Sequence, residues 1–180
     1  QNAQPESMSS GRFTLYFHGG AFALCSTATH RGLLYRLAQN SQAAIFSVDY
    51  RRPPEHPFPT PVDDCLSAYL YILEKVGDSS RIIFAGDSAG GNLVVSTMLR
   101  IAELGLDMPA GGVLLSPWVD LDDPGESESW RVNSAFDYID YASAALFANL
   151  YKAGAGESNV HLNLGHSSLS PLYSQHLSKL

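Results

Sequence analysis

A short apolar run that leads through a glycine and serine turn into a helical pattern constrains the fold of this chain most. Residues 81–85 (RIIFA) are typical of a buried strand, and residues 86–90 (GDSAG) match G-x-S-x-G. The following residues place apolar side chains at helical spacing. These are Leu93, Val94, Thr97, Met98 and Ile101. A strand, tight turn and helix in this order is the repeating unit of α/β proteins with a parallel sheet.

Three other apolar runs repeat the alternation. Strands are expected at residues 13–17, 43–50 and 112–116, with helical patterns between them. Because these strands are apolar on both faces, helices are expected to cover both sides of a mostly parallel sheet. We therefore expect one α/β domain over residues 1–180, with a helical cap insertion at about residues 122–168.

The serine of the glycine-rich turn is the first candidate for chemistry. Between a strand and a helix, G-x-S-x-G forms a sharp, strained turn that presents the serine hydroxyl above the sheet edge. The helix N-terminus beside Ser88 would favour developing negative charge. The pattern therefore indicates Ser88 as a nucleophile. A capping serine in an ordinary turn is the alternative.

A second glycine-rich turn follows the first expected strand. Enzymes with a serine at such a strand-to-helix turn stabilise the oxyanion with backbone N–H groups. One N–H group comes from the residue after the nucleophile, here Ala89, and the rest come from a glycine-rich loop of this kind. Gly20 and Ala21 are the expected donors, with Gly19 completing the oxyanion hole by allowing close approach. Ala21 is expected to serve if its φ is negative. The alternative is a simple β-turn with a surface histidine, His18.

Composition excludes several classes of function. A net charge of −7 argues against nucleic-acid binding, and no apolar run is long enough for a membrane span. Two cysteines, Cys25 and Cys65, are too few for a disulfide framework. Residues 1–11 are polar and lack the apolar part of a secretory signal, so a cytoplasmic location is expected. No motif for a metal or organic cofactor is present, and none is expected.

Five blocks resemble, in the same order, those of the hormone-sensitive-lipase family of α/β-hydrolases. Residues 86–93 match its GDSAGGNL block without change, and residues 18–22 resemble its HGGGF loop. Residues 49–59 resemble its DYRLAPEHPFP segment, with Arg52 and Pro53 as departures. Residues 116–121 and 170–172 resemble its SPW-x-DL and SPL blocks.

The resemblance implies a serine carboxylic-ester hydrolase that acts on small to medium acyl esters without a cofactor. Ser88 would be the nucleophile, with Gly19, Gly20, Ala21 and Ala89 at the oxyanion hole. Loop support is expected from three further side chains, because such loops need partners for buried polar groups. These are His18, Glu55 and Asp87.

The acid and base of the triad are harder to place. In the family they follow the SPL block, so both are expected beyond Leu180, and the chain is expected to be a partial copy that lacks N-terminal and C-terminal strands. We expect none of His161, His166 and His176 to act as the base, and the isolated chain to be a poor catalyst. A C-terminal segment in trans and a homodimer stay open as partners. A ligand-binding, receptor-like member of the fold and an inactive fragment are the alternative functions.

Overall fold

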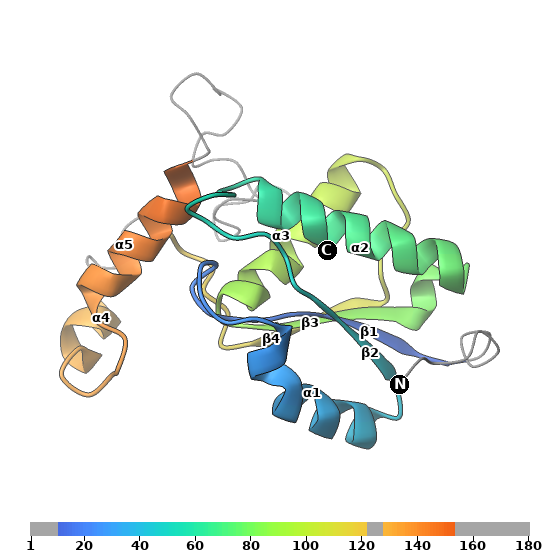
Figure 1. Ribbon diagram of the computed structural model, residues 1–180, viewed down its shortest axis with the longest axis horizontal. Coiled ribbons are helices and arrows are strands. Elements are labelled where there is room, and N and C mark those ends of the chain that lie inside the picture. The colour runs from blue at the N-terminus through green and yellow to red at the C-terminus, as the bar shows by residue number, and fades with distance from the viewer. Residues whose placement is uncertain (1–10, 122–127, 154–180) are drawn as a thin grey trace.

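Four parallel strands form the centre of the molecule. The computed structural model describes residues 11–121 and 128–153, and its sheet has the order β2-β1-β3-β4 (Figure 1). Each strand lies within two residues of the predicted bounds, and every pairing is parallel, as predicted. The strands are β1 (Phe13–Phe17), β2 (Ala44–Val48), β3 (Ile82–Asp87) and β4 (Gly111–Leu115).

Helices lie on both faces of the sheet, which confirms the predicted layering. Figure 1 shows α1 (Thr27–Ser41) on one face, with α2 (Thr60–Val76) and α3 (Ala89–Glu103) on the other. Two further helices, α4 (Glu128–Asn133) and α5 (Tyr141–Lys152), lie at one end, within the range predicted as a cap insertion. A short 3₁₀ helix, η2 (Ser79–Arg81), leads into β3. Among the residues that the structure describes, no helix is both long and apolar enough to cross a bilayer.

The register of the central strands brings two loops together. Phe17, the last residue of β1, pairs with Gly86 on β3 and with Val48 on β2. In a parallel sheet the carboxyl ends of neighbouring strands share one edge, where ligand sites of α/β proteins lie. The loops that follow β1 and β3 therefore emerge side by side.

Helix α3 is the most deeply buried helix among those described. Every residue from Ala89 to Leu99 is buried, because the helix lies between the sheet and α2. Of the five core positions predicted for this helix, four lie in this buried range, and the fifth, Ile101, is also buried.

Apolar spacing in residues 62–73 predicts a core face for α2 that the structure confirms only in part. The predicted members are Val62, Leu66, Tyr69, Leu70 and Leu73. Leu70 is 40% exposed, and the helix begins at Thr60, which its sequence marks as a cap before Pro61. The buried face shares Val62 and Tyr69 with the predicted one and follows positions spaced by three and four residues. Its members are Val62, Cys65, Tyr69, Ile72 and Val76.

Strand β4 departs from the expectation of strands buried on both faces. Val113, Leu114 and Leu115 are 49%, 41% and 39% exposed. The reason is position: β4 is the last strand of the sheet in the described part of the chain, whereas β1 and β3 lie between neighbours.

Candidate active site

Ser88 lies at the junction of β3 and α3, as predicted for a nucleophile elbow. Its φ of 53° and ψ of −119° lie outside the regions that residues with a side chain prefer. Such a conformation costs of order 1–3 kcal/mol and persists only when the surrounding structure holds it.

Backbone hydrogen bonds from the SPW segment hold this turn. The amide of Ser88 donates to the Leu115 carbonyl at 2.9 Å, and the Trp118 amide donates to the Ser88 carbonyl at 2.9 Å. The buried Asn92 amide group then donates to the Trp118 carbonyl at 2.9 Å. Two sequence blocks that the resemblance treats separately, residues 86–93 and 116–121, therefore form one structural unit.

Close backbone approach explains a glycine on the helix side of the turn. A Cβ atom on Gly90 would lie 2.0 Å from the Phe17 carbonyl oxygen and 2.8 Å from the His18 carbonyl carbon. A contact of this length is far inside van der Waals range. The start of α3 is therefore packed directly against the point where β1 becomes the next loop.

That loop, residues 18–25, has an unusual backbone. Gly20, Ala21 and Phe22 have φ values of 114°, 52° and 63°. The amides of Ala23 and Leu24 donate to the Gly20 carbonyl at 3.1 and 2.7 Å, which closes a tight turn. Ala21 was expected to serve as a donor if its φ were negative, and this condition is not met because the turn has a left-handed backbone at that position.

Asp87 connects the loop to the elbow. Its Oδ1 accepts hydrogen bonds from the Gly19 amide at 3.0 Å and from the Tyr16 hydroxyl at 2.8 Å. His30 Nε2 lies 3.2 Å from the same oxygen. Burial and this carboxylate raise the pKa of Tyr16, so its hydroxyl keeps its proton for the bond. The support predicted for Asp87 is thus present in its contacts.

The same contact defines the role of Gly19. This residue was expected to complete the oxyanion hole by allowing close approach, and a Cβ atom there would lie 2.2 Å from Asp87 Oδ2. Its own N–H group donates to Asp87. The donor roles of Gly20, Ala21 and Ala89 stay predictions, as does the convergence of their N–H groups on one oxygen position.

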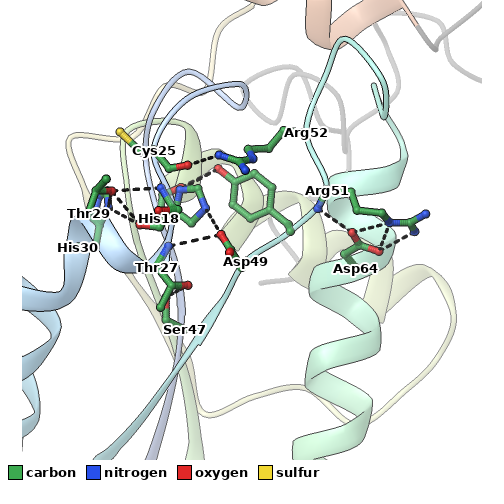
Figure 2. A network of polar contacts seen from close by, with 12 residues as sticks. His18, Cys25, Thr27, Thr29, His30, Ser47, Asp49, Arg51, Arg52 and Asp64 are labelled. Atoms are coloured by element: carbon green, nitrogen blue, oxygen red, sulfur yellow. Dashed lines mark hydrogen bonds and ion pairs between the residues drawn. The ribbon is translucent and has the colours of Figure 1, made fainter.

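His18 supports the loop from beneath (Figure 2). It is fully buried, its Nδ1 donates to the Gly19 carbonyl at 2.7 Å, and its ring stacks on Tyr50 at 4.4 Å. The Tyr50 hydroxyl donates to the His18 carbonyl at 2.8 Å. Asp49 lies 3.6 Å from Nε2, but burial is the larger effect and lowers the pKa of His18. The ring is therefore neutral at pH 7.

This neutrality predicts acid sensitivity. An unfolded His18 has a pKa near 6.5, above that of the folded chain, so stability is fully present above that value and falls as the pH drops below it. His18→Gln is expected to flatten the fall in unfolding free energy between pH 7.5 and 5, measured by urea denaturation. His56→Gln, at an exposed histidine, should keep it. Equal pH dependence in His18→Gln and the unchanged chain would contradict the prediction.

Residues 49–59 are held by arginines rather than by Glu55. Arg51 forms a bidentate ion pair with Asp64 of α2, at 2.8 Å from Nη2, and Arg52 donates to the Cys25 carbonyl (Figure 2). Glu55 is exposed and has no side-chain partner among the described residues, so the support predicted for it is not found there.

Comparison with known proteins identifies the family. A family model described as the alpha/beta hydrolase fold matches residues 14–180. The acetyl-hydrolase of Streptomyces hygroscopicus is 38% identical over 162 residues, which is 90% of this chain and 54% of that protein. A crystal structure of an esterase from the bacterial hormone-sensitive lipase family is 36% identical with a TM-score of 0.81, over 92% of this chain and 54% of that one. The chain belongs to the hormone-sensitive-lipase-type α/β-hydrolases.

An esterase of Acinetobacter venetianus is a further relative of this chain, 39% identical over 73% of this chain and 43% of that protein. The chain thus spans about half the length of the relatives it matches. His18 and His30 contact Gly19 and Asp87 rather than Ser88 in the described part of the chain. His161, His166 and His176 lie outside the described residues.

Four residues of the site were missed by sequence reasoning. Asn92 could have been found, because an amide side chain in an otherwise apolar helix needs a buried partner. Tyr16 lies between Leu15 and Phe17 in β1, so its side chain points to the other face of the sheet. This position was only a weak signal of a polar contact. No local signal marks His30 on an otherwise exposed helix, or Tyr50 beneath His18, since both contacts join distant segments.

Proposed function

We propose that the protein is a serine carboxylic-ester hydrolase for small to medium acyl esters, with Ser88 as nucleophile. The strained turn at Ser88, packed against a glycine-rich loop, is the observation that carries the proposal. The names of the relatives support the reaction class: they are an acetyl-hydrolase and esterases.

The proposed reaction has two stages. Ser88 Oγ attacks the ester carbonyl carbon as a base takes its proton, and the carbonyl oxygen becomes an oxyanion. The N–H groups of Gly20, Ala21 and Ala89 stabilise that charge as the intermediate forms. Collapse expels the alcohol, which receives the proton, and leaves an acyl ester on Ser88. Water then attacks this ester and gives a proton to the base, which passes it to Ser88 Oγ as the carboxylic acid leaves.

The loop geometry fits this role physically. Oxyanion donors act well when they are fixed in place before the charge appears, because no reorganisation is then needed. The Gly20 carbonyl accepts two amides within its own turn, and Asp87 and His18 hold the residue before it. The loop is therefore fastened to β3 and to the neutral histidine beneath it.

Substrate size and probe reactivity test the proposal. The gene product that contains this chain is expected to hydrolyse p-nitrophenyl acetate and butyrate well and the laurate ester slowly. Because His18 and His30 are engaged elsewhere, the 180-residue chain alone should react slowly with an organophosphonate probe and scarcely hydrolyse butyrate. A C-terminal segment supplied in trans is proposed to raise both rates.

Peptide mapping provides the check on the site. The phosphonate adduct should be found on Ser88 by mass spectrometry, and an adduct on another serine would contradict the assignment. Fast butyrate turnover by the 180-residue chain, lost in His166→Ala or His176→Ala, would place the base within the chain.

A further inference from the structure

The loop that carries the proposed oxyanion donors needs an external restraint. Ala21, Phe22 and Cys25 all have φ between 52° and 63°, the left-handed region that residues with a Cβ avoid. Each such residue costs roughly 1–2 kcal/mol. Asp87 holds the start of the loop at Gly19, and Arg52 holds its end at the Cys25 carbonyl. Neither contact reaches the strained residues in the middle.

A ring contact from α5 does reach them. Phe22 is fully buried, and its ring stacks on that of Tyr151 with centroids 3.8 Å apart and planes 11° from parallel. Phe22 directly follows Ala21, so a shift of its ring would move the Ala21 peptide. The Trp118 ring also lies beside the Phe22 ring, in a tilted arrangement with centroids 5.7 Å apart.

Tyr151 is itself well fixed. Its carbonyl accepts the Phe58 amide at 2.9 Å, and its ring meets that of Phe58 edge-on at 5.7 Å. The next residue, Lys152, donates from Nζ to the Leu121 carbonyl at 2.8 Å. The carboxyl end of α5 is therefore bound both to Phe58 in the segment of residues 49–59 and to Leu121 in the segment after β4. It can act as a rigid support for the Phe22 ring.

Tyr151 contributes through its ring rather than through its hydroxyl. The residue is completely buried, yet its hydroxyl has no hydrogen-bond partner among the described residues. An unsatisfied buried hydroxyl costs free energy. The Tyr151→Phe substitution should therefore preserve the stacking contact at no loss of stability.

We propose that Tyr151 is a positioning residue that holds the oxyanion loop in its strained conformation by stacking on Phe22. The inference rests on the proposed function for its catalytic consequence, but not for its effect on the loop. Through this contact α5 determines how well Gly20 and Ala21 stabilise the developing oxyanion.

Three variants of the gene product test the proposal. Tyr151→Leu removes the ring, Tyr151→Phe keeps it, and Leu146→Ala is the matched control at a 56% exposed position of the same helix. With p-nitrophenyl butyrate, Tyr151→Leu should lower kcat about 10- to 100-fold, somewhat less than the loss of a whole oxyanion donor. KM should change less than twofold, while Tyr151→Phe and Leu146→Ala keep kcat.

Hydrogen exchange gives a readout that does not depend on ester hydrolysis. The amides of Ala23 and Leu24, which close the turn on the Gly20 carbonyl, should exchange at least tenfold faster in Tyr151→Leu. The amide of Phe84 in β3 should be unchanged, and Tyr151→Phe should exchange like the unchanged chain. If the protein hydrolyses no ester, the proposed function fails and this measurement still decides the positioning role.

Several results would overturn the proposal. One is a Tyr151→Leu variant with unchanged exchange at Ala23 and Leu24. Another is a Tyr151→Leu variant whose kcat is the same as that of Leu146→Ala. If Tyr151→Leu does not fold by circular dichroism, Tyr151→Met supplies apolar bulk without a ring. Failure of both to fold would show that Tyr151 stabilises the whole domain rather than the loop.

Discussion

Ester hydrolysis by the gene product that contains this chain is expected to fall about 10⁵- to 10⁶-fold when Ser88 is replaced by alanine. Loss of the nucleophile alone removes nearly all the rate that a complete triad provides, because its members act as a unit. A residual rate above that in water should remain from the backbone donors of the loop. The measurement is kcat for p-nitrophenyl butyrate in purified variants.

Controls separate chemistry from folding. Ser67→Ala, at an exposed serine of α2 whose hydroxyl bonds to the Asp63 carbonyl, should keep full activity. Ser88→Gly should be as inactive as Ser88→Ala but more stable by about 1 kcal/mol, since glycine adopts φ of 53° without strain. Activity retained in Ser88→Ala would remove Ser88 from the mechanism.

Gly90→Ala is expected to have the largest effect on stability, a loss of more than about 3 kcal/mol or failure to fold. The added Cβ would lie 2.0 Å from the Phe17 carbonyl oxygen and 2.7 Å from its carbonyl carbon. Both atoms belong to a central strand that pairs on each side, so neither can move away. Urea denaturation monitored by circular dichroism measures the loss.

Gly32→Ala is the matched control for this substitution. Gly32 lies inside α1, and a Cβ atom there would meet no atom within 4 Å. Alanine in an exposed helix interior is expected to stabilise the fold by roughly 0.5–1 kcal/mol relative to glycine. Equal stability changes in the two variants would contradict the close approach of α3 to β1.

Local patterns predicted the sheet, the helices and the position of the elbow. Strand and helix positions follow from apolar periodicity and from turn residues, which are properties of neighbouring residues. The face of α2 was misjudged because Leu70 is apolar yet exposed, and periodicity alone could not choose between two overlapping faces.

Tertiary contacts account for the rest of the site. Ala21 has a positive φ beside Phe22, whose ring stacks on Tyr151 of α5, and no residue near Ala21 signals a contact with that distant helix. Gly19 was expected to allow close approach within the loop, but the partner of its amide, Asp87, lies 68 residues away and has no local signal near Gly19. The roles of Tyr16, His30 and Tyr151 depend on contacts of the same long-range kind.

The hydrogen bonds between the elbow and the SPW segment set an order for events during synthesis. Asn92 bonds to a partner 26 residues further along the chain, and the Ser88 amide needs the end of β4. At ribosomal rates that partner emerges roughly 1 to 5 s later. Until then the turn at Ser88 lacks the contacts that offset its strain, and the nascent chain should hold it in an ordinary backbone conformation. We therefore expect Ser88 to adopt its strained conformation late, after the sheet around it has grown past β3.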